Sequence, residues 1–389
     1  MKNFIFKNPT KLIFGKGTIS KIGEELKKDS IKKAMLVYGK GSIFKNGVYD
    51  EVVKSLKENN IDFVEIGGIK PNPVLSKVKE AIAFGHEHNI DAIVPIGGGS
   101  VYDTCKGISA GFYYKGDVWD FYEGKESNLE KALPIYGVLT ISATGSEMNS
   151  GGVITNEEEQ KKWSFGHELL YPKASIVDPN IQCSLPKKET INGIVDTMTH
   201  VFELYFDGVK NVDLMQEYCE GIIRTAMKHG EILLEDPNNY DSRAELALCA
   251  TLALNRTTGM GKGGGDWASH DIEHSVSVLY DISHGAGLAI IFPAWAKYVY
   301  KENLDLFSRF AEKVFDIKEG TLEEKALKGI EELMAFYKKI GAPISLKEVN
   351  VTEDALEKLA DNAAMSCPIG LLKKLEREDV LQILKLAYF

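Results

Sequence analysis

Asp196 and four histidines stand at spacings that could build a metal site. Asp196 and His200 are four residues apart in a segment of helical periodicity, so their side chains would share one face of a helix. His270 and His274 repeat this spacing, and His284 follows at a predicted helix start. One carboxylate and three imidazoles suit a divalent transition metal such as iron(II) or zinc. Five candidates for about four coordination positions would leave one histidine free to transfer a proton.

The surroundings of Asp196 favour a metal site over a purely structural role. The residue lies among Ile194, Val195 and Met198, where an unpaired carboxylate would be costly and a bound cation would compensate its charge. The alternative is that the histidines are core side chains on apolar helix faces. One pair of histidines spaced by four residues is not rare by chance. The spacing alone leaves open which of the five side chains bind the metal.

The turn at residues 97–100 is a candidate phosphate site. It reads Gly-Gly-Gly-Ser, and it follows a short apolar run and precedes a predicted helix at 101–110. Glycines would leave room for a ligand close to the backbone, and a helix N-terminus offers N–H groups and a partial positive charge to phosphate. The usual G-x-G-x-x-G spacing is absent, so the turn could also be a simple strand-to-helix connection.

Two further turns could complete a dinucleotide site. Gly39-Lys40-Gly41-Ser42 follows an apolar run and has no carboxylate where one commonly binds the adenosine ribose, so it would accept a 2′-phosphate instead. Hydroxyl residues alternate in the turn at 140–146 and could hydrogen-bond phosphate, ribose or amide groups of a cofactor. Each segment could equally be an ordinary glycine or polar turn.

Two kinds of elements must position these residues. Short apolar runs alternate with helical patterns up to about residue 180, which predicts a parallel sheet with crossover helices. Beyond that, helical periodicity dominates, with predicted helices at 187–206, 213–235, 241–260, 267–280 and 288–301. We therefore expect an α/β domain at 1–183 and an all-helical domain at 184–389.

The composition is that of a globular protein and excludes several classes. The chain has 389 residues, 44% of them hydrophobic and 26% charged, with a formal net charge of −10. It is neither collagenous nor disordered, and an acidic surface disfavours nucleic-acid binding. The five cysteines are odd in number and form no C-x-x-C pair, which indicates a reducing compartment. No signal-peptide core or long apolar run occurs, so we expect a cytoplasmic protein without a membrane span.

Taken together, these segments resemble one known family, the iron-containing alcohol dehydrogenases, and within it the NADPH-dependent butanol dehydrogenases. The order and spacing of the motifs agree over essentially the whole chain. The segments that carry the resemblance are Asn-Pro-Thr-Lys at 8–11, Phe-Gly-Lys-Gly at 14–17, Gly-Gly-Gly-Ser-Val-Tyr-Asp at 97–103, Ile-Ser-Ala-Thr-Gly-Ser-Glu at 141–147, Asp-Thr-Met-Thr-His at 196–200, Asp-Trp-Ala-Ser-His at 266–270, and the histidines at 274 and 284.

The resemblance implies an N-terminal dinucleotide-binding α/β domain, a C-terminal helical metal-binding domain and an active-site cleft between them, an architecture shared with dehydroquinate synthase. It implies that Asp196, His200, His270 and His284 bind the metal, and that His274 stands near the nicotinamide as the catalytic residue, with the proton path through His274 or the cofactor ribose. The cofactor-binding residues that it implies are Gly39, Gly41, Ser42, Gly97, Gly98, Gly99, Ser100, Asp103, Thr140, Thr144, Ser146, Asn149 and Lys162.

We therefore expect a metal-dependent NADP(H) alcohol dehydrogenase or aldehyde reductase for short- to medium-chain substrates such as butanol and butanal. One rival is a lyase of the dehydroquinate synthase type, but its anionic substrate needs a cluster of basic side chains beside the metal, and residues 266–287 contain no Lys or Arg. Another rival is a nucleotide- or metal-binding module without activity. The apolar segments at 4–6 and 12–14 are strand signals outside the main alternation, and exposed strands need a partner. The resemblance also implies strand exchange, so we expect a homodimer.

Overall fold

The computed structural model describes residues 1–389, and the chain forms two compact units. One unit contains Lys7–Pro186 and Asp236–Asn255, and the other contains Met1–Phe6, Lys187–Glu235 and Arg256–Phe389. This division differs from the two continuous domains that the sequence predicts.

Two segments account for the difference. The helix within Asp236–Asn255 joins the α/β unit, because the Thr251 hydroxyl donates to the buried Glu147 carboxylate at 2.6 Å. The first residues join the helical unit, where the Met1 ammonium donates to the Lys210 carbonyl at 3.0 Å. Helical periodicity marks an element but does not determine the unit against which it packs.

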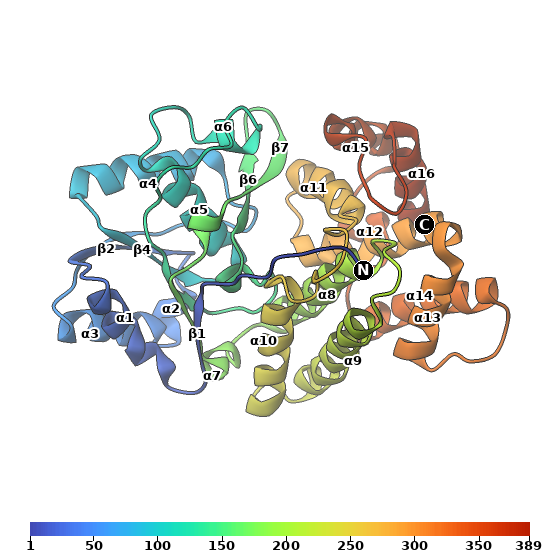
Figure 1. Cartoon of the computed structure of the whole chain (residues 1–389), viewed down its shortest axis with the longest axis horizontal. Helices are drawn as coiled ribbons and strands as arrows, with labels where there is room; N and C mark the ends of the chain where they lie inside the picture. Colours follow the sequence, from blue (N-terminus) through green and yellow to red (C-terminus); the bar gives the residue numbers. More distant parts are fainter. The chain divides into compact units, whose positions relative to one another are not determined.

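The α/β unit contains a six-stranded parallel sheet in the order β1-β8-β5-β4-β2-β3. Figure 1 labels β1, β2 and β4 of this sheet. Its strands are β1 (Lys11–Phe14), β2 (Lys33–Tyr38), β3 (Asp62–Ile66), β4 (Ala92–Gly97), β5 (Tyr136–Leu139) and β8 (Ala174–Val177). An antiparallel hairpin is formed by β6 (Gly151–Asn156) and β7 (Lys161–Gly166). The segment at 12–14 is therefore part of the main sheet, whereas 4–6 forms no strand in this chain.

Helices cover both faces of this sheet, which explains why its strands are apolar throughout. Met35 and Val37 of β2 pack in a core with α4 and α5, and Ala34 and Leu36 of β2 pack in a second core with α1 and α3. The helices of the unit are α1 (Ile22–Lys28), α2 (Ser42–Lys45), α3 (Val48–Glu58), α4 (Leu75–His88), α5 (Gly99–Gly111), α6 (Trp119–Tyr122), α7 (Pro179–Gln182) and α10 (Tyr240–Leu254), with short 3₁₀ turns at η1 (Thr18–Lys21), η2 (Ser146–Met148) and η3 (Glu168–Leu170).

The helical unit is built around α12, which packs against α8, α11, α14 and α16 (Figure 1). Aromatic side chains fill its core, with the rings of Phe202 and Phe292 stacked at 4.5 Å and those of Phe206 and Phe307 at 4.3 Å. Its helices are α8 (Lys187–Tyr205), α9 (Asp213–Glu235), α11 (Ala268–Tyr280), α12 (His284–Val299), α13 (Leu304–Phe315), α14 (Leu322–Ile340), α15 (Leu356–Ala363) and α16 (Arg377–Tyr388), with 3₁₀ turns at η4 (Tyr300–Asn303), η5 (Leu346–Val349), η6 (Glu353–Ala355) and η7 (Ala364–Ser366).

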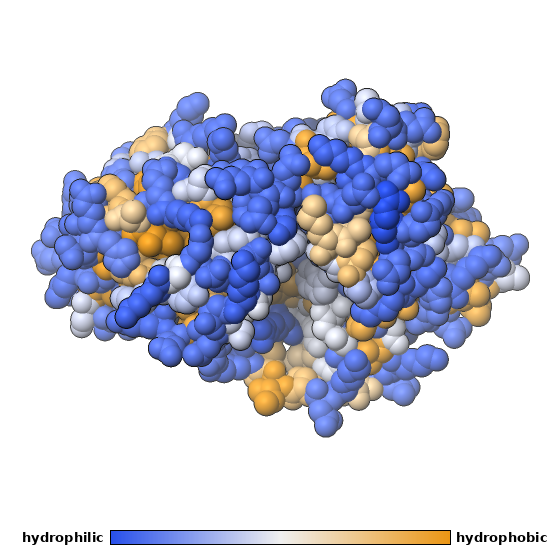
Figure 2. Space-filling model, turned by 90° about the horizontal axis from the view of Figure 1, so that it is seen from above, coloured by the Kyte–Doolittle hydropathy of each residue, from blue (hydrophilic) through white to orange (hydrophobic).

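The face of the molecule in Figure 2 is mostly hydrophilic, and the hydrophobic residues on it lie in small separate groups. None of the helices combines the length and the low polarity that crossing a membrane would require.

Candidate active site

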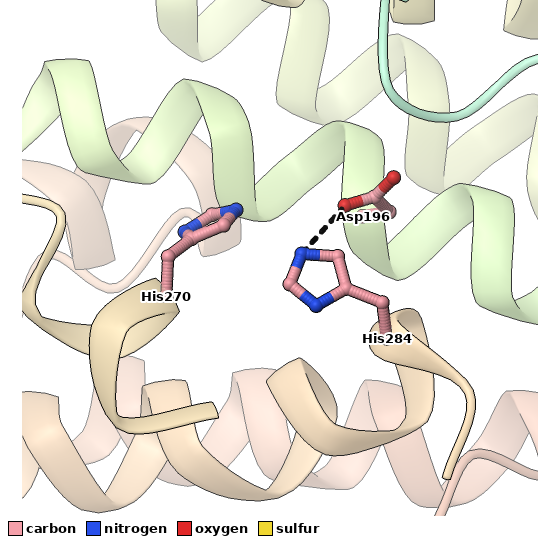
Figure 3. A group of neighbouring side chains, drawn as sticks. All are labelled: Asp196, His270 and His284. Carbon is pink, nitrogen blue, oxygen red and sulfur yellow. Dashed lines mark ion pairs between the residues drawn. The ribbon is translucent and has the colours of Figure 1, made fainter. Parts of the chain in front are cut away.

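Three of the four predicted metal ligands come together in the helical unit. Asp196 lies on α8, His270 on the first turn of α11, and His284 is the first residue of α12. One potential ligand atom from each lies within 4.8 Å of the others, and the three side chains point toward a common centre (Figure 3). His284 Nε2 is 3.9 Å from Asp196 Oδ1. A carboxylate and two imidazoles so placed could hold a divalent metal.

The fourth predicted ligand, His200, lies beside this group. It follows Asp196 by one turn of α8, and its Nδ1 is 3.6 Å from Asp196 Oδ1, while its ring centroid is 4.9 Å from that of His270. His200 Nδ1 and His270 Nε2 are buried and have no hydrogen-bond partner. Buried nitrogens without partners are costly in a folded protein, and a metal ion would satisfy them. The donor set therefore fits the divalent metal that the sequence predicts.

Two buried glutamates orient two of the histidines through hydrogen bonds to their Nδ1 atoms. His270 Nδ1 donates to the Glu203 carboxylate at 2.7 Å, and His284 Nδ1 donates to the Glu273 carboxylate. A ring whose Nδ1 carries the proton offers its Nε2 lone pair to a metal, so these bonds fix the required tautomer. Both glutamates are buried, and the sequence analysis missed them. The signal for Glu203 was the one used for Asp196, an acidic residue in an apolar helical segment.

The electrostatics differ between the buried histidines, with the pKa of His200 shifted down and that of His270 shifted up. Burial lowers the pKa of His200 far below its usual value, and neighbouring His270 and His284 lower it further. Burial is the largest single influence on His270 and lowers its pKa, but the hydrogen bond to Glu203 together with the charges of Glu203, Asp196 and Glu273 outweighs burial, so the net shift is upward. A metal bound at His270 would therefore displace a proton as it binds.

Two glycines let the start of α12 approach its neighbours. A Cβ on Gly285 would overlap the Asn192 carbonyl of α8, and a Cβ on Gly287 would overlap the Glu273 carboxylate of α11. This close approach places His284 next to both helices. The Gly-Ala-Gly segment after His284 is therefore part of the site.

His274 lies one turn after His270 on α11 and is partly exposed. Its ring centroid is 5.6 Å from that of His284, but it does not belong to the group formed with Asp196. It falls instead in an overlapping group with Glu273 and His284, whose carboxylate and Nδ1 already bind each other. His274 therefore lies beside the candidate ligands, and its catalytic role stays a prediction.

In the α/β unit, the three predicted cofactor turns follow adjacent strands. Tyr38 of β2 pairs with Ile96 of β4, and Gly97 of β4 pairs with Leu139 of β5. Because carboxyl ends of parallel strands share one sheet edge, the turns at 39–42, 97–100 and 140–146 lie side by side. Ligands of open α/β sheets bind outside this edge.

The glycines of the central turn also allow close packing of the neighbouring turn. A Cβ on Gly98 would overlap Ile141, and a Cβ on Gly99 would overlap Thr144. These positions therefore make room for the neighbouring turn, and their contact with a cofactor stays a prediction. Helix α5 begins at Gly99 without a side-chain cap, which leaves its first N–H groups available to an anion.

The remaining predicted cofactor residues differ in how they are presented. Ser100, Thr140, Thr144 and Asn149 are partly exposed. In contrast, Ser146 is buried and donates to Asp103 Oδ1 at 2.8 Å, while Asp103 Oδ2 accepts from the Val153 N–H. The surroundings of Ser146 and Asp103 thus favour an internal role in shaping the loop. Lys162 on β7 is buried, with its Nζ 3.0 Å from Asn72 Oδ1.

The α/β unit has glycine turns at the carboxyl edge of a parallel sheet, and the helical unit gathers a carboxylate and imidazoles. This is the arrangement of a metal- and dinucleotide-dependent enzyme. Comparison with known proteins specifies the family. Residues 9–179 match the iron-containing alcohol dehydrogenases, and residues 190–388 match the C-terminal part of the same family. The chain belongs to the iron-containing alcohol dehydrogenase family.

Individual relatives match over their full lengths. The chain is 45% identical over 387 residues to a probable NADH-dependent butanol dehydrogenase of Bacillus subtilis, covering 99% of both chains. It is 32% identical to the NADPH-dependent aldehyde reductase of Escherichia coli, covering 98% of this chain and 95% of the relative. The solved structure of the NADH-dependent butanol dehydrogenase A of Thermotoga maritima superposes with a TM-score of 0.98 at 52% identity, covering 100% of this chain and 99% of that one.

Proposed function

We propose that this protein is a metal-dependent NADP(H) alcohol dehydrogenase that interconverts short- to medium-chain primary alcohols and aldehydes, such as butanol and butanal. The observation that carries this proposal is the cluster of Asp196, His270 and His284, with partnerless buried nitrogens on His200 and His270. The names of the relatives support the substrate class. We also propose that the protein works in the cytoplasm, where its five unpaired cysteines would stay reduced.

Each part of the chain has a defined task in this proposal. Asp196, His270 and His284, with His200 beside them, would hold iron(II) or zinc. The bound metal would supply Lewis-acid stabilisation of the developing alkoxide, and the cofactor would supply the hydride chemistry. Glu203 and Glu273 keep two imidazole rings in the ligating tautomer.

The cofactor and the proton are handled by other residues. The N-terminus of α5 would bind the pyrophosphate, together with Thr140 and Thr144, while Asn149 and Lys162 would face the nicotinamide ribose. His274, beside His284, would pass a proton between the substrate and solvent.

The direct test is NADPH consumption against a panel of linear aldehydes, with metal analysis of the same preparation. We expect turnover of butanal that is lost on chelation and restored by added iron(II) or zinc. Turnover that is insensitive to chelation would contradict the metal-dependent proposal, and a protein that turns over no aldehyde or alcohol with either cofactor would contradict the activity.

The choice of NADP(H) depends on the turn after β2. Gly39 carries no side chain, and Lys40 and Ser42 are exposed beside it, which suits a 2′-phosphate. The structure adds Glu65 of β3 near this turn, but its carboxylate is engaged by the hydroxyls of Tyr38 and Tyr49. The relatives bear names of both kinds, NADH-dependent and NADPH-dependent.

We expect the unmodified protein to prefer NADPH over NADH by about tenfold or more, equivalent to about 1.4 kcal/mol. Gly39→Asp is expected to collapse or invert this preference. The new carboxylate would repel a 2′-phosphate and accept a hydrogen bond from a free ribose hydroxyl. A Cβ at this position would lie 3.5 Å from the Ile69 carbonyl, an ordinary contact, so the variant should fold. The measurement is kcat/KM for both cofactors. An unchanged ratio would show that this turn does not read the 2′ position.

We also propose that the protein is a homodimer. Phe4, Ile5 and Phe6 are 51%, 94% and 45% exposed, an unusual cost for consecutive apolar side chains in water. Ile5→Lys should weaken dimerisation about tenfold or more, because burying one such side chain stabilises by about 1.5–3 kcal/mol. Light scattering across a dilution series measures this, with Leu214→Lys, at an exposed aliphatic residue elsewhere on the surface, as the control. An unmodified protein that is monomeric at micromolar concentration would refute the proposal.

A further inference from the structure

Lys106 of helix α5 is a deeply buried lysine to which the preceding mechanism gives no task, with an exposed fraction of 1%. Its ammonium group donates to Ser146 Oγ at 2.7 Å, to Asn149 Oδ1 at 2.7 Å and to the Gly151 carbonyl at 2.6 Å. An ammonium group has three N–H donors, so all of them are used. All three acceptors lie in one segment, residues 144–151, which overlaps the end of the hydroxyl turn at 140–146.

These bonds extend into a network that fixes the segment. Asn149 Oδ1 also accepts from the Gly151 N–H at 3.1 Å, and Asn149 Nδ2 donates to the Thr144 carbonyl at 3.4 Å. Ser146 Oγ donates to Asp103 Oδ1, so α5 holds the segment through a second side chain. The same helix begins at the predicted phosphate site. One ammonium group thus links the N-terminal phosphate-binding helix to the segment that carries Asn149.

Burying the charge of Lys106 costs free energy that an apolar side chain in the same place would not. An apolar side chain of similar volume often gives equal or greater stability than a buried charge. The acidic side chains of Asp103 and Glu147 attract the ammonium group and offset part of this cost. A buried charge with three directed bonds, in contrast, holds its acceptors in one geometry. This favours a role in placing the segment over a role in packing alone.

We propose that Lys106 is a positioning residue for the nicotinamide half of the cofactor, which sets the place of the Asn149 amide relative to the start of α5 without touching the cofactor. The inference rests on the proposed function, because it takes the dinucleotide to bind at this edge of the sheet. It concerns the nicotinamide half because all the bonds of Lys106 go to residues 144–151 and none goes to the turn at 39–42, which is assigned to the adenosine end.

The charge state of Lys106 adds a pH signature. Burial lowers the pKa of Lys106 to about 8, although Asp103 and Glu147 act in the opposite direction. The other titratable neighbour, Cys105, stays a neutral thiol because burial raises its pKa, and Lys162 acts on Asp103. Above about pH 8 a neutral amine has two donors for three acceptors. Affinity for the whole cofactor should therefore weaken as pH rises through about 8.

The test compares two ligands in the metal-loaded Lys106→Met protein. One is the reduced dinucleotide that the unmodified protein prefers, and the other is ADP, which lacks the nicotinamide half. We expect the Kd of the dinucleotide to rise about tenfold or more, with loss of its pH dependence near 8, while the Kd of ADP changes less than about twofold. Lys54→Met, at an exposed lysine of α3, is the matched control and should change neither value.

An equal loss of affinity for both ligands would indicate a merely structural role and overturn the inference, as would an unchanged Kd for the dinucleotide. Should Lys106→Met fail to fold, Ser146→Ala removes one of the three acceptors, and the same selective loss is expected, at smaller size. Equal or absent losses in that variant would overturn the inference. If the unmodified protein binds neither NADPH nor NADH, the proposed function fails and this inference falls with it.

Discussion

Replacing His270 with alanine is expected to strip most of the metal and to lower kcat/KM by about 10³-fold or more, while the protein stays folded. His270 Nε2 is buried without a hydrogen-bond partner, and Asp196 and His284 face it within 4.8 Å, so its removal opens the ligand set. A lost factor of 10³ corresponds to about 4 kcal/mol, within the several kcal/mol that Lewis-acid stabilisation contributes. Metal content per chain and kcat/KM, measured on one preparation, test this. His284→Ala should behave alike.

A graded control separates ligation from general damage to the site. Glu203→Gln keeps the shape of the side chain behind His270 but removes its charge, so metal affinity should fall about 10- to 100-fold rather than vanish. A competition titration with a chelator measures this without recourse to activity. His229→Ala, on the outer helix α9, should leave metal content and activity unchanged. Full metal content and activity in His270→Ala would show that the assigned ligand set is wrong.

The sequence predicted best those elements whose pattern is local. The helix expected at 213–235 is α9 with the same bounds, because one apolar face repeats along its whole length. In contrast, the periodic pattern predicted a helix only from 288, although α12 begins at His284, which the sequence analysis had also placed at a helix start, and α10 ends at Leu254 rather than at 260. Because α12 is apolar on every side, its hydrophobic pattern has no periodicity that marks the residue at which the helix begins.

The residues of the candidate site also divide into those with a local sequence pattern and those whose partners are distant in the chain. Asp196, His270 and His284 were among five candidates that spacing and residue type indicated, and the family resemblance, not the spacing, selected them as predicted ligands. The supporting residues Glu203 and Lys106 were missed, because their partners are 67 and 40 positions away in the chain. Only the fold brings such pairs together. A charged side chain inside an apolar helical run is the sequence signal that could have raised both as candidates.

His274→Ala is expected to retain the metal and to lower turnover by about 10²- to 10⁴-fold, the usual contribution of a positioned acid or base. His274 stands one turn after His270 on α11, and its ring centroid is 5.6 Å from that of His284, so it lies next to the candidate ligands. It lies outside the group that includes Asp196, and it remains partly exposed, as a proton path to solvent requires. Metal content, KM and kcat are measured together, and the loss should appear in kcat.

Chemical rescue distinguishes proton transfer from a structural effect of this substitution. The alanine variant leaves space where an imidazole ring stood, so added imidazole should restore part of the turnover if the lost group carried a proton. His229→Ala, which keeps full turnover in this proposal, should show no response to imidazole. Loss of the metal from His274→Ala would instead identify His274 as a metal ligand. His200, the predicted ligand outside the 4.8 Å group, would then be removed from the assigned ligands. Unchanged turnover with full metal content would remove His274 from the mechanism altogether.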